Sequence, residues 1–253
     1  MPNDLATGPP LAVAIALSSL AGAPAAAGDQ RAKREPVDSA LAYYDGLKAE
    51  DADSFLARIR PPGLAEPLRA QAKSSRSKED QLLPTGKDLR KLAVIDPILR
   101  YHDRLGVIEI ALIDAPYAVM GLYARTQILI SRGALDEIDP RELQAVAAHE
   151  LGHEYFWDEY EKAGFERDED RVRELELRCD GIAVLTLRRL GLDPRHLTDA
   201  LTHLTWYNER KGARLTTGPY PSLSQRARFV HALTRSFAPA VRGRSTGPLI
   251  RQR

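Results

Sequence analysis

The chain has 253 residues, of which 43% are hydrophobic and 28% charged, and its formal net charge is +1. This length and composition allow a normal buried core and predict one main domain with additions. The balanced charge gives no general attraction to nucleic acid or to a membrane surface, and we expect no nucleic-acid partner.

The N-terminus predicts export. Residues 11–21 form an apolar run that is followed by alanines at positions 25–27, and this order is typical of a signal peptide with a small-residue cleavage site. We therefore expect residues 1–27 to be a signal peptide and the protein to be periplasmic or extracellular. The first four residues lack the usual Lys or Arg, so an uncleaved anchor or an Ala-rich leader remains an alternative. The run is too short and too interrupted by Gly and Pro to predict a membrane span.

The region from residue 28 to residue 85 is expected to form an N-terminal helical segment and a linker. A helix is predicted over residues 37–59, and the run Pro-Pro-Gly at positions 61–63 ends it. The polar residues 71–80 are typical of a linker or a mobile loop. At the other end, the basic residues 241–253 are expected to form a flexible tail.

The main domain, expected over residues 86–240, combines several helices with a small sheet. A helix is predicted over residues 89–102, and its core-facing positions are Leu92, Ile95, Ile98 and Leu99. Residues 107–113 and 126–131 are rich in β-forming side chains, and a further strand is predicted around residues 117–120. This pattern indicates a mainly helical α+β fold.

Three later helices are marked by their first residues. Asp139, Pro140 and Glu142 supply an N-cap, a first-turn proline and a capping-box glutamate. Asp193 and Pro194 open a second helix, in which His203 is expected to be a packing or surface residue. Ser222 to Gln225 predicts a capping box for the last helix.

His149, Glu150 and His153 lie in the run Ala-Ala-His-Glu-Leu-Gly-His-Glu of the first of these helices. Residues four apart share one helix face, so the two imidazoles can bind one metal ion with Glu150 beside them. Zinc in a hydrolytic site takes three protein ligands and leaves one position for water, whose pKa falls to about 7. The alternative is a solvated or core histidine pair, but the predicted helix favours the metal site.

The third ligand is expected downstream, where Glu176 and Asp180 are again four residues apart on a helical stretch. One of them can bind zinc while the other hydrogen-bonds the second ring nitrogen of a ligand histidine. Cys179 lies between them and is the only cysteine, so it has no intrachain disulfide partner. Thiolate ligation by Cys179 is an alternative, although free cysteines more often pack in the core.

These segments resemble the M48-type zinc metallopeptidases of the gluzincin group over residues 106–233. Residues 128–138, Ile-Leu-Ile-Ser-Arg-Gly-Ala-Leu-Asp-Glu-Ile, and the helix with both histidines look like the family's strand, turn and active-site helix. Residues 176–180, Glu-Leu-Arg-Cys-Asp, match its Glu-x-x-x-Asp pattern. The resemblance implies that Glu176 is the third zinc ligand and that Asp180 supports a ligand. It also implies one zinc per chain and a zincin-like fold whose small sheet packs beside the active-site helix.

The chain departs from the family at two places. Residues 115–118 read Ala-Pro-Tyr-Ala where the family often has Asn-Ala-Phe-Ala, so substrate contacts there are expected to differ. Tyr220 and Pro221 stand where many relatives have His-Pro, and Arg226 follows at the family's spacing. We hypothesise that the Tyr220 phenol stabilises the oxyanion of the reaction, the alternative being a packing tyrosine. Arg226 is expected either to brace a carboxylate of the site or to be an ordinary surface arginine.

The predicted chemistry is peptide-bond hydrolysis. Glu150 is expected to be the general base that takes a proton from the zinc-bound water and passes it to the departing amine. The resemblance implies a metalloendopeptidase that acts on proteins or peptides, with a role in envelope protein quality control. The alternative is a latent or non-catalytic zinc-containing module that binds polypeptides in the manner of a chaperone. Glu150 favours the enzyme, because a structural zinc site needs no general base.

Overall fold

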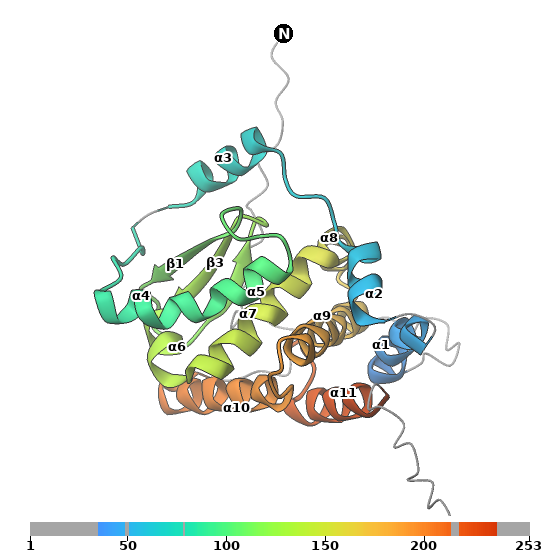
Figure 1. Ribbon diagram of the computed structural model, residues 1–253. Coiled ribbons are helices and arrows are strands. Elements are labelled where there is room, and N and C mark those ends of the chain that lie inside the picture. The colour runs from blue at the N-terminus through green and yellow to red at the C-terminus, as the bar shows by residue number, and fades with distance from the viewer. Residues whose placement is uncertain (1–34, 49–50, 78, 214–217, 237–253) are drawn as a thin grey trace, which may run out of the picture.

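The computed structural model describes residues 35–48, 51–77, 79–213 and 218–236. The predicted signal peptide over residues 1–27 and the predicted tail over residues 241–253 lie outside them. The described chain has the mainly helical α+β fold predicted from the sequence, with one small sheet (Figure 1). Within the described residues, no helix combines the length and the apolar composition that crossing a membrane requires.

The elements follow one another in an order that begins and ends with helices. The helices are α1 (Pro36–Tyr43), α2 (Ala52–Ile59), α3 (Glu66–Ser75), α4 (Gly86–Leu92), α5 (Asp96–Tyr101), α6 (Arg132–Glu137), α7 (Pro140–Tyr155), α8 (Trp157–Glu166), α9 (Glu169–Arg189), α10 (Arg195–Arg210) and α11 (Leu223–Ser236). Two 3₁₀ turns, Tyr44–Lys48 and Ala93–Ile95, follow α1 and α4. The strands are β1 (Glu109–Ile113), β2 (Met120–Tyr123) and β3 (Gln127–Ser131).

The sheet has the strand order β1-β3-β2, so β1 and β2 lie at its two edges. β1 pairs parallel to β3, with Ala111 opposite Leu129, and β2 pairs antiparallel to β3, with Gly121 opposite Leu129. The strand predicted around residues 117–120 is misplaced, because β2 begins only at Met120. The backbone of Ala118 is instead bonded by the buried side chain of Asn208, which accepts from its N–H at 2.7 Å and donates to its C=O at 3.0 Å.

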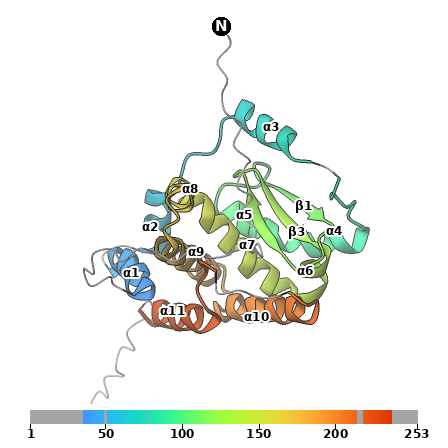
Figure 2. The same ribbon diagram turned by 180° about the vertical axis from the view of Figure 1, so that it is seen from behind.

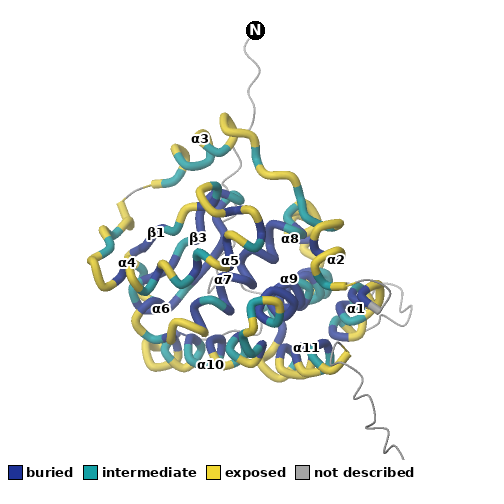
Figure 3. The backbone as a smooth tube through the Cα atoms, in the orientation of Figure 1, coloured by how far each residue is buried: buried dark blue, intermediate teal, exposed yellow. Residues whose placement is uncertain are grey.

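The N-terminal prediction is only partly right. The helix predicted over residues 37–59 is divided into α1 and α2 by a 3₁₀ turn, and the chain then turns at the predicted prolines. The polar residues 71–80 are not entirely a loop, because α3 continues to Ser75. No residue of α3 is buried, and the helix lies at the periphery of the protein in Figures 1 and 3. It contacts the sheet through Lys73, which pairs with Glu109 at 2.6 Å, and through Ser75, whose hydroxyl lies 3.3 Å from that of Tyr123. The polar composition of residues 71–80 therefore indicated solvent exposure and not the absence of a helix.

The helix predicted over residues 89–102 is also divided, since α4 and α5 are separated by a 3₁₀ turn and Pro97 lies in the first turn of α5. All four positions predicted to face the core are buried. The capping boxes predicted at Asp139 and at Ser222 are both present. In the second, Ser222 N donates to Gln225 Oε1 at 2.9 Å and Gln225 N donates to Ser222 Oγ at 3.2 Å.

The core is centred on α7 and α9, which pack against each other along much of their length. The sheet lies on one side of α7, and α1 and α11 cover α9 on the other side (Figures 1 and 2). Figure 3 shows α7 and α9 as the most continuously buried part of the backbone. The approach of α1 to α9 depends on Gly181, because a Cβ there would lie 2.3 Å from the ring of Tyr44. The two most buried helices are thus the two that carry the predicted site.

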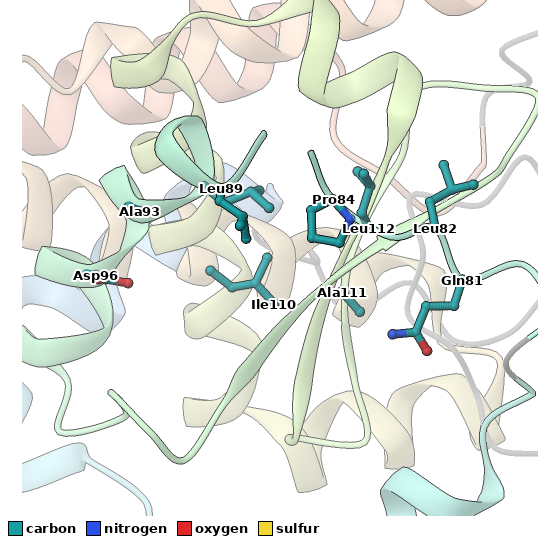
Figure 4. Close-up of a pocket in the computed structure, with 10 residues that line it drawn as sticks. Gln81, Leu82, Pro84, Leu89, Ala93, Asp96, Ile110, Ala111 and Leu112 are labelled. Carbon is teal, nitrogen blue, oxygen red and sulfur yellow. The ribbon is translucent and has the colours of Figure 1, made fainter. Parts of the chain in front are cut away.

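A pocket of about 280 Å³ lies at the outer edge of β1, where residues 81–84 and α4 approach the sheet (Figure 4). An antiparallel bridge joins Gln81, one of the lining residues, to Ile113 of β1. Its lining residues are Gln81, Leu82, Pro84, Leu89, Leu92, Ala93, Asp96, Ile110, Ala111 and Leu112. None of these is a residue of the predicted metal site.

Candidate metal centre

His149 and His153 lie one turn apart on α7 and point their ring nitrogens toward Glu176 on α9. The distance from His149 Nε2 to Glu176 Oε2 is 3.5 Å, and that from His153 Nε2 to Glu176 Oε1 is 3.7 Å. One potential ligand atom from each residue lies within 4.8 Å of the others. All three side chains are buried. The structure therefore brings together the three residues that the sequence predicts as ligands.

Close packing of the two helices makes this convergence possible. A Cβ at Gly152 would lie 2.7 Å from Cys179 Cα and 3.0 Å from the Cys179 carbonyl oxygen, so a larger residue would push α7 and α9 apart. Cys179 is fully buried at this contact. Its Sγ lies 3.6 Å from His153 Nδ1, on the ring nitrogen that faces away from Glu176. This position fits the packing role predicted for the cysteine, with a weak polar contact to His153.

His149 is supported by Asp180, whose Oδ1 lies 2.8 Å from His149 Nδ1. Burial by itself lowers the pKa of His149, but the hydrogen bond to Asp180 and the negative charges of Asp180 and Glu176 raise it to about 10. The second ring nitrogen of His153 contacts Cys179 Sγ, and burial lowers the pKa of His153 to about 4 despite the charge of Glu176. Metal binding would displace the proton from His149, because a histidine binds a metal through an unprotonated nitrogen.

Glu176 is held by two donors on opposite oxygens. Arg226 Nη2 donates to Oε2 at 2.7 Å, and the Tyr160 hydroxyl donates to Oε1 at 2.8 Å. Arg226 also donates from Nη1 to Asp180 Oδ1 at 2.6 Å. Burial opposes ionisation of Glu176, but the nearby His149 ring, 3.5 Å away, and the positive charge of Arg226 hold its pKa well below the usual value. Arg226 is buried, so it braces two carboxylates rather than lying on the surface.

Glu150 occupies a different environment from that of Glu176. Its Oε2 accepts a hydrogen bond from Leu122 N of β2 at 3.0 Å. Its Oε1 is buried and has no hydrogen-bond partner among the residues that the structure describes. Burial raises the pKa of Glu150 to about 7, against the lowering effect of His149. The carboxyl group is thus poised to exchange a proton near neutral pH.

The donor set fits zinc. Two imidazole nitrogens and one carboxylate are the ligands of a common catalytic zinc site, and such a site keeps one position open. His149 Nε2 is buried without a hydrogen-bond partner among the described residues, whereas buried polar atoms are normally paired. A metal ion between the three side chains would satisfy this nitrogen.

Two tyrosines lie beside Glu176, and the sequence pointed to only one of them. Tyr220, in the segment before α11, is partly buried and is hydrogen-bonded to Tyr160. Burial and the charge of Glu176 raise the pKa of Tyr220 to about 12, so its proton is retained at neutral pH. Tyr160 was missed because it lies on α8 and reaches the site only through the packing of α8 on α9. No local spacing rule predicts that contact.

Among known protein families, the model of peptidase family M48 matches residues 92–166, which include the sheet, α7 and all of α8. The chain is related to the M48 peptidases. These are zinc metallopeptidases, so the match supports a hydrolase that cleaves peptide bonds and takes protein or peptide substrates. A search of curated proteins found no significant match.

The M48 match covers only part of the metal centre. His149, Glu150 and His153 lie inside the matched residues, while Glu176, Asp180 and Arg226 lie beyond them. The geometry of the second group therefore comes from the structure alone. Direct hydrogen bonds join His149 of the matched helix α7 to Asp180 of α9, and Arg226 of α11 to Asp180 and Glu176 of α9.

Proposed function

We propose that this M48-type chain is a zinc metalloendopeptidase, with His149, His153 and Glu176 as the zinc ligands and Glu150 as the general base. The proposal rests on two buried atoms that have no hydrogen-bond partner among the described residues. They are the ligand nitrogen His149 Nε2 and the carboxylate oxygen Glu150 Oε1. Both are buried on neighbouring residues of α7. A bound zinc would supply Lewis acidity, which acidifies water and polarises a peptide carbonyl.

Glu150 is suited to the proton transfers of hydrolysis. The hydrogen bond from Leu122 N orients its carboxylate through Oε2, which leaves Oε1 to accept a proton from water as the water attacks the peptide carbonyl. The same carboxyl group then gives the proton to the departing amine. A polypeptide-binding module with a structural metal has no use for such a residue, so Glu150 favours the enzyme over the chaperone-like alternative.

The support of the ligands comes from α9 and α11. Asp180 fixes the ring of His149 through Nδ1, and Arg226 holds Asp180 and Glu176 in one arrangement. Such partners orient metal ligands and raise metal affinity. Arg226 is a positioning residue in this account, because it acts through the two carboxylates.

An extended polypeptide is the substrate that the sheet suits. Among the strands that the structure describes, β2 pairs only with β3, and the N–H of Leu122 donates to Glu150. A peptide laid along this edge as an added strand would pass beside the general base. Tyr220 is the proposed donor to the oxyanion that forms there. Tyr220→Phe should then lower kcat by about 10²- to 10³-fold, and full turnover in this variant would remove Tyr220 from the mechanism.

Export to the bacterial envelope, with a role in protein quality control there, is the proposed setting. It is supported by the apolar run at residues 11–21 and the alanines that follow. Detection of the full-length gene product in the cytoplasm alone, after fractionation of the cells, would overturn this part of the proposal.

The direct test is proteolysis of an unfolded protein by the purified full chain. Zinc-loaded protein is incubated with reduced, alkylated casein, and new internal termini are identified by mass spectrometry. We expect internal cleavages that stop after treatment with a chelator and return when zinc is added back. Absence of cleavage by zinc-loaded protein, or cleavage that survives complete removal of the metal, would contradict the proposal.

A further inference from the structure

Tyr160 touches two of the three proposed ligands from outside α7 and α9. It lies on α8 and is partly buried. Its hydroxyl donates to Glu176 Oε1 at 2.8 Å. Its ring stands edge-on to the ring of His153, with centroids 5.0 Å apart and an angle of 86° between the planes. One side chain therefore borders both a histidine and the carboxylate of the site.

The hydroxyl of Tyr160 completes the environment of the Glu176 carboxylate. An ionised carboxylate only accepts hydrogen bonds, and it rotates unless both oxygens are held. Arg226 holds Oε2 at 2.7 Å, so Tyr160 fixes the oxygen that Arg226 leaves. Burial raises the pKa of Tyr160 well above its ordinary value, so the phenol keeps the proton that it donates.

Tyr160 also connects the site to the segment before α11, because its phenol is hydrogen-bonded to that of Tyr220. Arg226 belongs to α11 itself. The carboxylate of Glu176 is thus held by α8 on one oxygen and by α11 on the other, and Tyr220 links the two sides. Loss of the Tyr160 hydroxyl would release both Glu176 and Tyr220.

We propose that Tyr160 is a positioning residue for the metal ligands, which orients the Glu176 carboxylate through Oε1 and ties it to Tyr220. The inference rests on the proposed function, since it assigns Glu176 as a ligand. It adds a tyrosine from α8 to the partners of the site, and neither the motif at His149 nor the matched pattern at Glu176 points to it.

The test is Tyr160→Phe in the full chain, because this change removes the hydroxyl and keeps the ring against His153. Zinc affinity is measured by competition with a chromogenic chelator, and the cobalt-substituted proteins are compared by visible absorption. We expect about 10- to 100-fold weaker zinc binding, as for other partners of metal ligands, and a changed cobalt spectrum. The matched control is Tyr101→Phe, which removes a phenol that donates to Asp53 at 2.7 Å outside the site. The control should bind zinc as the wild type does.

The outcomes separate this inference from the proposed function. Equal zinc affinity and an identical cobalt spectrum in wild type and Tyr160→Phe would overturn the positioning role and leave the peptidase proposal standing. Wild-type protein that is folded and binds no zinc would overturn both. Weaker zinc binding with an unchanged melting temperature supports Tyr160 even if casein is not cleaved, because affinity is measured without substrate.

Discussion

Helix α7 takes part in two largely buried polar clusters, which differ in whether their polar atoms have hydrogen-bond partners. The metal cluster consists of His149, Glu150, His153, Glu176 and Asp180. The structural cluster consists of His102, Arg104, Glu154, Tyr155 and Thr186. In the metal cluster, His149 Nε2, Glu150 Oε1 and Asp180 Oδ2 have no hydrogen-bond partner among the described residues.

In the structural cluster the same kinds of side chain are paired. His102 contacts Tyr155 through Nδ1 at 2.8 Å and Thr186 through Nε2 at 2.9 Å. Arg104 donates from Nε to Glu154 Oε2 at 2.7 Å, and its other nitrogens donate to backbone carbonyls. Buried polar groups that are hydrogen-bonded in this way stabilise the fold, whereas buried polar groups without a partner indicate a bound ligand or a catalytic role. Pairing, rather than burial or residue type, separates the two clusters.

The largest expected effect is on turnover in Glu150→Gln. This change keeps the shape of the side chain and removes the proposed base, so kcat should fall by about 10²- to 10⁴-fold. Zinc content and melting temperature should stay at wild-type values, because Glu150 is not a proposed ligand and only one of its carboxylate oxygens, Oε2, accepts a hydrogen bond. Turnover is measured on the casein substrate and unfolding by circular dichroism. An active Glu150→Gln enzyme would refute the assignment.

Glu154→Gln, four residues further along α7, should instead lower the stability of the fold and leave zinc binding unchanged. Removing one partner of a buried ion pair leaves Arg104 uncompensated, which costs about 3–5 kcal/mol in the free energy of unfolding. Urea denaturation measures this loss, and the zinc content per folded chain should stay the same. Glu109→Gln is the control, since it breaks an exposed pair with Lys73 and should cost at most about 1 kcal/mol. A fully stable Glu154→Gln protein would show that this cluster is not structural.

Stability should depend on pH through His102. Burial lowers its pKa to about 3, and the charges of Arg60 and Arg104 act in the same direction. In the unfolded chain its pKa is about 6.5, so the unfolded state takes up a proton that the folded state refuses. The contribution of His102 is therefore complete above pH 6.5 and is lost as the pH falls toward 3, by about 1.4 kcal/mol per pH unit.

Urea unfolding between pH 6 and pH 5 measures this slope for wild type and for His102→Gln. The variant is expected to be less stable at every pH but to have the smaller slope, by the contribution of one proton. Equal slopes in the two proteins would mean that His102 is charged in the folded state.

The smallest effect is expected from Cys179→Ser. A serine hydroxyl can replace the weak contact of the thiol with His153 Nδ1, so zinc content should be unchanged. Burying a hydroxyl in place of a thiol should lower the free energy of unfolding by about 1 kcal/mol. Elemental analysis and urea denaturation check the two parts. Loss of zinc from a folded Cys179→Ser protein would instead support the cysteine as a ligand.

Local signals in the sequence predicted much of the fold and part of the centre. The capping boxes at Asp139 and Ser222 involve residues three apart, so their side chains and backbone set the helix starts without help from the rest of the chain. The spacing of His149 and His153 likewise needs only a helix. The periodic apolar positions from Leu92 to Leu99 predicted the buried face even though the helix itself is interrupted.

The failures involve contacts between segments that are distant in the sequence. The side chain of Asn208 on α10 bonds the backbone of Ala118, and β2 begins only at Met120. Strand propensity is a property of the local sequence and does not predict this contact. Tyr160, on α8, and Arg104, in the loop after α5, reach their carboxylates at sequence separations of 16 and 50 residues. Side chains that support a site through tertiary packing leave no periodic signal, so the ligands were easier to predict than the residues that hold them.

The binding of one zinc ion by His149, His153 and Glu176 can be tested directly. We would measure the zinc content of the purified full chain by elemental analysis after exhaustive dialysis, for wild type and for Glu176→Gln, with Glu174→Gln as the matched control on α9. The account predicts one zinc per chain in wild type and in the control, and a marked loss in Glu176→Gln. Folded wild-type protein without zinc, or full zinc in Glu176→Gln, would contradict it.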